Sequence, residues 1–259
     1  MTALSRMTMI EVKADLHIHT VLSPCGDLDM SPRMIVERAV AENLEIIGIA
    51  DHNSLKQVEV VEKIAAQHGV FVLGGVEITT REEVHCLAFF RDQVTRKAFQ
   101  EYLDAYLPVI PNVDGAFGYQ VVVDEEEMVL EIEEKLLVTG LSKGIDAVEQ
   151  EVHRLGGIFI PAHIDRPVNS VFSQLGFLPR GLRFEALEAT CFATESEVRK
   201  RFGLDGKLTL IQDSDAHFPA DIGRGYSLFT LETCSFEEIV MALAGEGGRK
   251  AEIRRGKEI

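Results

Sequence analysis

Cysteine is scarce in this sequence, and its spacing is not that of a disulfide framework or a cysteine zinc site. The four cysteines are Cys25, Cys86, Cys191 and Cys234, and no two of them form a C-x-x-C pair. Zinc ribbons usually contain such pairs, and disulfide scaffolds need a denser set of cysteines. We therefore expect reduced thiols, which are the normal state in the cytosol.

The sequence also lacks a long apolar run near its start. The segment "MTALSRMTMIEVKA" has no stretch of the length that a membrane-targeting segment needs. We therefore expect a cytoplasmic protein without a membrane partner.

Basic residues are outnumbered by acidic ones. Lys and Arg total 26 against 42 Asp and Glu, which gives a formal net charge of -16. A surface of this charge repels a polyanion unless a local basic patch overrides the repulsion. The composition therefore favours a small substrate and predicts no long nucleic acid as a partner, while it indicates nothing about the oligomeric state.

Short apolar runs alternate with helical patterns along the chain, which is typical of βαβ units with a mainly parallel sheet. The helical segments carry recognisable start signals. Ser31 is a predicted N-cap with Pro32 at the first helical position, and Ser235 with Glu238 forms a predicted capping box. The predicted strands are residues 44–50, 70–78, 84–90, 156–162, 184–190 and 207–212. The length of 259 residues fits one large domain or two small ones.

The region of residues 92–143 breaks this rhythm, and we interpret it as a β-rich insertion with a hairpin. Its acidic run from Asp124 to Glu127 is predicted to be a solvated turn and not a metal site. The tail from residue 245 has too little apolar content to predict an element.

The motif "DLHIHT" places His17 and His19 two residues apart. In a strand such residues point to the same side, so the pair can offer two imidazole ligands to one metal ion. A single His-x-His pair is weak evidence, but other candidates stand at the ends of predicted strands. These are His52 next to Asp51, Glu77, His163, Asp215 and His217, with His85 at the start of a run.

The carboxyl ends of the strands of a closed parallel barrel meet on one face, where such folds build their sites. Each candidate taken singly could be a hydrogen-bonded core histidine or a helix cap, but so many together favour a metal centre. His68 and His153 lie on helical stretches and are assigned to solvent. Imidazole and carboxylate ligands suit zinc, manganese or ferrous iron, and the lack of thiolate clusters favours catalytic over structural metal.

The motifs resemble those of the PHP (polymerase and histidinol phosphatase) family, in particular its stand-alone metal-dependent phosphoesterases. They occur in the family's order as "DLHIHT", "ADHNS", "GVEIT", "EVHCL", "PAHIDRP" and "DSDAH", from residue 15 to residue 217. The resemblance implies a distorted seven-stranded β/α barrel, similar to a TIM barrel. It also implies a trinuclear metal centre, at which we expect two or three manganese, zinc or iron ions to bind. We expect one domain over residues 1–259.

The resemblance also implies a ligand set for each ion. The first ion would be held by His17, His19, Glu77 and Asp215. Glu77 would bridge to a second ion held by His85 and His163. His52 and His217 would serve the third ion.

One departure from the family pattern affects the third ion. Many PHP phosphoesterases have Ser-Asp-Gly shortly after His-x-His, whereas this chain has "SPCGDLD", with Pro24 at the position of the aspartate. Cys25 and Asp27 are the available replacements. We favour Asp27 as the ligand, and the alternative is that neither side chain binds.

The implied chemistry is hydrolysis of a phosphoester. Two ions about 4 Å apart share a hydroxide that attacks phosphorus, so no nucleophilic side chain is needed. Arg166 and Arg224 are candidates for binding the phosphate, although each could form an ordinary salt bridge instead. Asp51 is a candidate for orienting His52 or another ligand.

Three functions are consistent with this interpretation. The favoured one is a phosphomonoesterase acting on a small phosphorylated metabolite or nucleotide. The first alternative is a nuclease that acts on nucleic-acid ends. The second is a non-catalytic metal-binding domain, which the nearly complete ligand set disfavours.

Overall fold

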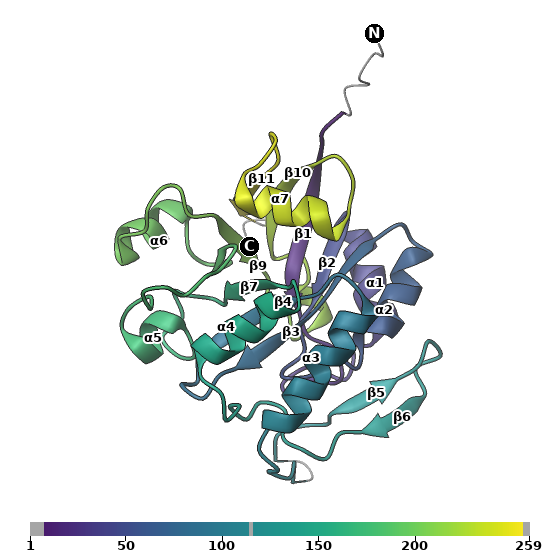
Figure 1. The fold of residues 1–259 in the computed structure, drawn as a ribbon. Helices are drawn as coiled ribbons and strands as arrows, with labels where there is room; N and C mark the ends of the chain where they lie inside the picture. Colours follow the sequence, from purple (N-terminus) through teal and green to yellow (C-terminus); the bar gives the residue numbers. More distant parts are fainter. Residues whose placement is uncertain (1–7, 114–115, 256–259) are drawn as a thin grey trace.

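The computed structural model describes residues 8–113 and 116–255, in which strands and helices alternate along most of the chain (Figure 1). The strands are β1 (Ile10–Ile18), β2 (Ile46–Ile49), β3 (Phe71–Thr79), β4 (His85–Phe89), β5 (Val121–Val123), β6 (Val129–Ile132), β7 (Ile158–Pro161), β8 (Leu187–Thr190), β9 (Leu210–Asp213), β10 (Gly225–Leu231) and β11 (Lys250–Arg255). The α-helices are α1 (Pro32–Ala41), α2 (Val58–Ala66), α3 (Gln93–Tyr106), α4 (Ile145–Arg154), α5 (Val171–Leu175), α6 (Glu195–Phe202) and α7 (Phe236–Ala244), and a 3-10 helix covers Pro219–Asp221.

The central sheet has seven strands in the order β11-β10-β1-β2-β3-β4-β7. β1, β2 and β3 run parallel to one another, as the βαβ pattern predicted. β4 is antiparallel to both of its neighbours, and β10 is antiparallel to β1 and β11. The sheet is therefore mixed rather than mainly parallel, since β3 and β4 follow each other directly without a crossover helix.

A separate parallel pair, β8 with β9, fills the space between β7 and β1 and curls the structure round on itself. On the β7 side, the amide of Ile164 donates to the carbonyl oxygen of Glu188 at 2.8 Å. On the β1 side, the amide of Ala216 donates to the carbonyl oxygen of His17 at 3.1 Å. These bonds link β1, β2, β3, β4, β7, β8 and β9 into the distorted seven-stranded barrel that was predicted.

The helices pack outside the sheet because each buries one apolar face. α1 buries Ile35, Val36 and Ala39 and begins as predicted, with the Ser31 hydroxyl accepting from the amide of Met34. α7 also begins as predicted, at Ser235. The predicted capping box is only half formed, however, because the Glu238 carboxylate binds Arg249 and the amide of Glu232 instead of the cap.

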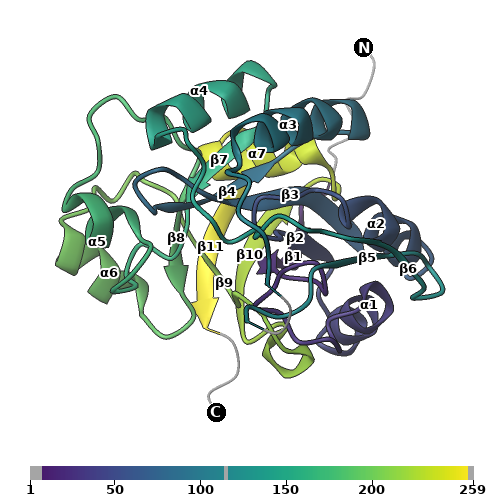
Figure 2. The ribbon, with the colours of Figure 1, turned by 90° about the horizontal axis from the view of Figure 1, so that it is seen from below.

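The insertion of residues 92–143 contains the predicted hairpin, β5 with β6, but it opens with the helix α3. Asp92 caps α3, and the helix buries Phe99 and Leu103 against the core. Figure 2 shows the hairpin beside α2 and far from α5 and α6. The acidic run forms the hairpin's turn, with Glu127 at a φ of 64°. In the tail, β11 pairs with β10 although its sequence gave no strand signal.

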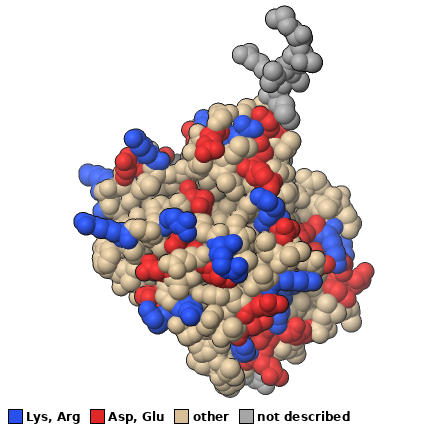
Figure 3. Space-filling view, in the orientation of Figure 1, with Lys and Arg blue, Asp and Glu red and all other residues tan. Residues whose placement is uncertain are grey.

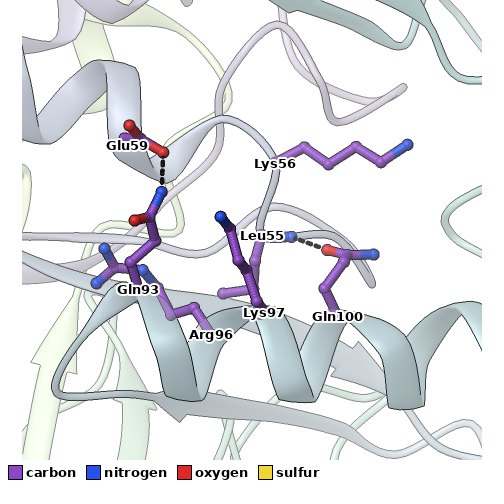
Figure 4. Close-up of a pocket in the computed structure, with 7 residues that line it drawn as sticks. All are labelled: Leu55, Lys56, Glu59, Gln93, Arg96, Lys97 and Gln100. Atoms are coloured by element: carbon purple, nitrogen blue, oxygen red, sulfur yellow. Dashed lines mark hydrogen bonds between the residues drawn. The ribbon is translucent and has the colours of Figure 1, made fainter.

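A hollow of about 190 Å³ lies between α2 and α3 (Figure 4). Most polar side chains around it form hydrogen bonds or ion pairs with the other helix or with adjacent segments. The amide of Leu55 donates to Gln100 at 2.7 Å, and Arg96 pairs with Glu62 at 2.6 Å. Because these groups satisfy one another, we regard the hollow as a packing feature. None of the described helices is long and apolar enough to cross a membrane.

Candidate metal centre

The side chains that the sequence predicted as metal ligands gather at one end of the barrel. Most of them follow or end a strand, but His85 is the first residue of β4. Because β4 runs antiparallel to β3, His85 pairs with Thr79 at the carboxyl end of β3. The reversed strand therefore brings His85 to the same end of the barrel as the other candidates.

Glu77 lies at the centre of the cluster and is 1% exposed. Its Oε1 atom is 2.7 Å from Nδ1 of His85 and 3.0 Å from Nε2 of His163. Its Oε2 atom is 3.1 Å from Nδ1 of His52. The two oxygens of one carboxylate thus face different groups of histidines, which is the geometry of a bridging ligand.

His17 and His19 face the Oε2 side of Glu77. Nε2 of His17 lies 3.5 Å from both Glu77 Oε2 and Asp215 Oδ1, and Nε2 of His19 lies 3.4 Å from the same two atoms. The ligand atoms of these four residues all lie within 4.8 Å of one another. The structure thus brings together the set that the resemblance implies for the first ion.

Two further groups of potential ligands overlap this one. They consist of His52, Glu77 and His85, and of His19, Cys25, His52 and His217. Sγ of Cys25 lies 3.1 Å from Nε2 of His217. The favoured Asp27 is not part of either group, because its carboxylate accepts from the amide of Asp29 and its own amide donates to the carbonyl oxygen of His217. The loop therefore brings Cys25, and not Asp27, to the cluster.

The cluster fits a set of metal ions by its unsatisfied atoms as well as by its chemistry. Nδ1 of His163 is buried without a hydrogen-bond partner in the described part of the chain, and Nδ1 of His52 and Oδ1 of Asp215 are buried with ion-pair contacts but no well-aligned hydrogen bond. Leaving buried polar atoms unpaired is costly, so such atoms point to a missing partner. Imidazole nitrogens and carboxylate oxygens at these positions are suitable ligands for zinc, manganese or iron.

Glu77 and His217 have protonation states that suit cation binding. Burial raises the pKa of Glu77, but His85, His17 and His52 outweigh it and hold this pKa well below its usual range. Burial and the neighbouring His19 lower the pKa of His217 to about 4. The carboxylate is therefore ionised and this imidazole is neutral, which are the states that coordination requires.

Burial is outweighed at the two histidines of the first group. Glu188 and Glu77 raise the pKa of His17 well above its usual value, and Asp215 and Glu77 raise the pKa of His19 to about 9. These two rings therefore release a proton when they bind a cation.

Asp51 supports the cluster through the loop that follows β1. Its carboxylate accepts from the amide and the hydroxyl of Thr20 and from the hydroxyl of Ser23, each at 2.7 Å. Oγ of Ser23 in turn lies 2.9 Å from Nδ1 of His19. Of the two alternatives for Asp51, the hydrogen bonds therefore favour the orientation of another ligand, His19, over that of the His52 ring.

The sequence analysis missed Glu188, a buried carboxylate in β8. Its Oε1 atom lies 2.9 Å from Nδ1 of His17, and its Oε2 atom accepts from the amide of His163 at 2.7 Å. Glu188 is 1% exposed. The available signal was a charged residue within the apolar run "FEALEAT", because an acid rarely occupies a buried strand without a partner.

Two of the candidate ligands have a strained backbone. His163 has a φ of 29° and Asp215 a φ of 52°. Positive φ is uncommon for residues other than glycine and persists where the surrounding structure enforces it. Such strain at two potential ligands supports a functional role for this end of the barrel.

The two arginines predicted to bind phosphate line one cavity of about 290 Å³ beside the cluster, together with His163 and Asp215. Nη1 of Arg166 lies 2.6 Å from Oδ2 of Asp215. Arg224 pairs with Asp221 at 2.8 Å. Each arginine therefore forms the predicted alternative, a salt bridge, but both stand at the cavity that borders the cluster.

The two histidines assigned to solvent differ from each other. His68 is exposed, as predicted. His153 is half-buried on α4, where Nε2 lies 3.1 Å from Oε1 of Glu185 and Nδ1 contacts Glu149. The prediction for His153 was wrong, because acidic residues on its own helix and on a neighbouring segment surround it.

Two family models match parts of this chain. Residues 15–93 match the family model of the PHP domain, and residues 208–246 match the model described as PHP-associated. The resemblance inferred from the motifs is therefore confirmed. The second match covers β9, β10 and all of α7, together with the Asp215 motif that begins at the end of β9.

Two curated relatives and one solved fold are similar to this chain. The uncharacterized protein YqxK of Bacillus subtilis is 24% identical over 276 positions, which cover 93% of this chain and 64% of YqxK. A 5'-3' exoribonuclease of Haemophilus influenzae is 34% identical over 71 residues, 27% of this chain and 25% of that protein. The lesion-specific endonuclease Q of Pyrococcus furiosus superposes with a TM-score of 0.70 at 22% identity, over 93% of this chain and 58% of that one. The chain thus spans less than two thirds of the length of these proteins.

The prediction of a small substrate and of no long nucleic acid is wrong. A second structure of endonuclease Q holds a 27-mer duplex substrate with an abasic lesion at the active site, and it superposes with a TM-score of 0.69 over 93% of this chain. Net charge failed as a criterion because it sums over the whole surface, whereas phosphate binding depends on local cations. Part of the negative charge also belongs to carboxylates such as Glu77 and Asp215, which metal ions would neutralise.

Proposed function

We propose that this PHP-type protein is a metal-dependent phosphoesterase that hydrolyses phosphodiester bonds in a nucleic acid. The observation that carries the proposal is the set of three overlapping ligand groups that share Glu77, His19 and His52. The nucleic-acid substrate is supported by endonuclease Q and by the exoribonuclease, which resemble different lengths of this chain.

The ligand assignment follows the three groups in part, and it adds His163 to the second one because Nε2 of His163 lies 3.0 Å from Oε1 of Glu77. His17, His19, Glu77 and Asp215 would hold one ion, and Glu77 would share a second with His85 and His163. His52, Cys25 and His217 would hold a third. Zinc, manganese or ferrous ions at such positions activate water and neutralise phosphate oxygens.

The protein's own groups orient the reactants. Asp215 faces the first ligand group with Oδ1 and Arg166 with Oδ2, so it fixes the guanidinium at the rim of the cluster. A phosphate in the adjoining cavity would meet Arg166 and Arg224, whose planar groups suit two oxygens at once. Glu188 and Ser23 hold the rings of His17 and His19 in place.

Basic residues near this cavity support a polyanionic substrate despite the net charge. The last turn of α6 carries Arg199, Lys200 and Arg201. Figure 3 shows Lys and Arg side chains on the left of the view, the side on which Figure 1 places α6. Such a local patch can attract a nucleic acid to one part of an acidic protein.

Two broader features belong to the proposal. We propose that residues 1–259 act as one PHP-type domain, in which residues 92–143 are an insertion. We also propose a reducing, cytoplasmic compartment, which is supported by four free cysteines.

The experiment is an assay of the purified chain, loaded with manganese or zinc, on labelled oligonucleotides and on phosphomonoesters. The oligonucleotides are single-stranded and duplex, with and without an abasic site. We expect two or three metal equivalents per chain and cleavage of at least one oligonucleotide, abolished by chelation. Cleavage of phosphomonoesters alone would overturn the proposed substrate, and activity that survives chelation at less than about one metal equivalent would overturn the metal-dependent mechanism.

A further inference from the structure

Phe192 is an exposed aromatic residue beside the candidate metal centre. It follows β8 by two residues, and 71% of its surface is exposed. It lines the 290 Å³ cavity that also contains Arg166 and Arg224. The guanidinium of Arg224 lies over the Phe192 ring at 5.6 Å from its centroid.

Phe192 also lines a second hollow, which is shallow and about 620 Å³ in volume. Lys200 and Arg201 of α6 line it, together with Asp165 and Glu197. The two acids are engaged locally. The Asp165 carboxylate accepts from the hydroxyl of Thr190 at 2.6 Å, and Glu197 completes the capping box of α6. Phe192 thus borders both a cavity with two arginines and a hollow with two further cations.

Packing does not account for this position of Phe192. The rings of Phe172 and Phe202, by contrast, stack on each other at 4.2 Å between ring centroids, with their ring planes 15° apart. Phe192 has the Arg224 guanidinium over its ring and keeps 71% of its surface exposed. Proteins that bind single-stranded nucleic acids often place an exposed aromatic side chain among cations, because bases stack on the ring while the cations hold the phosphate backbone.

We infer that Phe192 is a stacking platform for an unpaired nucleobase adjacent to the scissile phosphate. This inference rests on the proposed function and adds a determinant of specificity to it. The phosphate lies in the cavity of Arg166 and Arg224, the neighbouring base lies on Phe192, and the strand continues over Lys200 and Arg201. Substrates with an unstacked base at this position are therefore preferred.

The test is a cycle that changes both the protein and the substrate. Wild type, Phe192→Ala and Phe192→Trp are assayed on a single-stranded oligonucleotide and on the same strand with one base near the cleaved bond replaced by an abasic analogue. We expect Phe192→Ala to raise KM about tenfold on the complete strand and to have little effect on the abasic one. Phe192→Trp should retain the wild-type KM. Phe177→Ala is the control, since Phe177 is also an exposed phenylalanine, with 60% exposure.

The outcomes separate this inference from the proposed function. Equal KM values for wild type and Phe192→Ala on the complete strand overturn the stacking role and leave the nuclease proposal intact, as does an equal loss on both strands. If metal-loaded wild type cleaves no oligonucleotide, the proposed function fails. Equilibrium binding of the same two strands then decides the inference, and equal affinity of wild type and Phe192→Ala overturns it.

Discussion

Oε1 of Glu188 lies 2.9 Å from Nδ1 of His17, and both side chains are fully buried at the base of the cluster. A carboxylate on one ring nitrogen fixes the orientation of the imidazole and leaves Nε2 facing Glu77 and Asp215. Carboxylates of this kind behind a ligating histidine raise metal affinity. Glu188 is therefore a positioning residue for the proposed first ion.

Glu188→Gln should weaken metal binding by about 10- to 100-fold, because the neutral amide holds His17 less firmly. A competition titration with a chromophoric chelator measures this affinity directly. Glu185→Gln is the matched control, since Glu185 contacts His153 instead of the cluster. Equal affinities for the two variants would show that Glu188 has no part in metal binding.

Glu77→Gln should reduce the hydrolysis rate about a thousandfold, because loss of a bridging charge costs several kcal/mol of transition-state stabilisation. His68→Ala should change the rate little, since His68 is exposed. His153 is unsuitable as the control because it is ion-paired. Rates would be compared at equal folded fraction, and similar rates for the two variants would remove Glu77 from the centre.

Cys25→Ser should remove one metal ion, whereas Asp27→Asn should not. The reason is that Sγ of Cys25 reaches His217, while the Asp27 carboxylate binds within its own loop. Metal analysis and the absorption spectrum of the cobalt-substituted protein are the measurements, since only a thiolate ligand gives sulfur-to-cobalt charge transfer. Loss of an ion in Asp27→Asn alone would reverse the assignment, and no loss in either would exclude this loop from the centre.

Arg166→Lys and Arg224→Lys should each raise KM about tenfold, because lysine keeps the charge but loses the planar fork that binds two phosphate oxygens. Steady-state kinetics on a cleavable oligonucleotide give the values. Arg154→Lys is a suitable control, since this exposed arginine pairs with Glu151. Unchanged KM in both cavity variants would show that neither arginine touches the phosphate.

The stability of α4 should depend on pH through His153. The hydrogen bond with Glu185 raises the pKa of His153 above its ordinary value of 6.5, and Glu149 raises it further. Together the two carboxylates outweigh burial, which lowers this pKa. A raised histidine pKa stabilises the fold fully below about pH 6.5 and loses this contribution as the pH rises through the folded-state pKa. His153→Gln should therefore lower the free energy of unfolding more at pH 5.5 than at pH 9. Denaturant unfolding at the two values measures it, and a pH-independent difference would contradict the ion pair.

The sequence was informative where residue spacing alone determines the direction in which side chains point. His17 lies in β1 and His19 directly follows the end of this strand, so the expectation that the two share a face holds, and both reach Glu77 in the structure. The sequence was uninformative where an element depends on its partner. β11 is charged and gave no strand signal, but β10 supplies the hydrogen bonds that make it one. The helix α3 was not predicted, because the segment that follows it is irregular, although Asp92 is a suitable N-cap residue for it.

By itself, the sequence determined the alternation of strands and helices, the ligand types and their order along the chain, because these depend on local propensity and periodicity. Only the tertiary structure decided which of these side chains meet. The reversal of β4 brings His85 to Glu77, and β8 places Glu188 behind His17 across 171 residues. The loop after β1 presents Cys25 instead of Asp27 because its backbone is bonded to His217. Contacts of this range depend on strand direction and loop closure, which residue types and spacing do not specify.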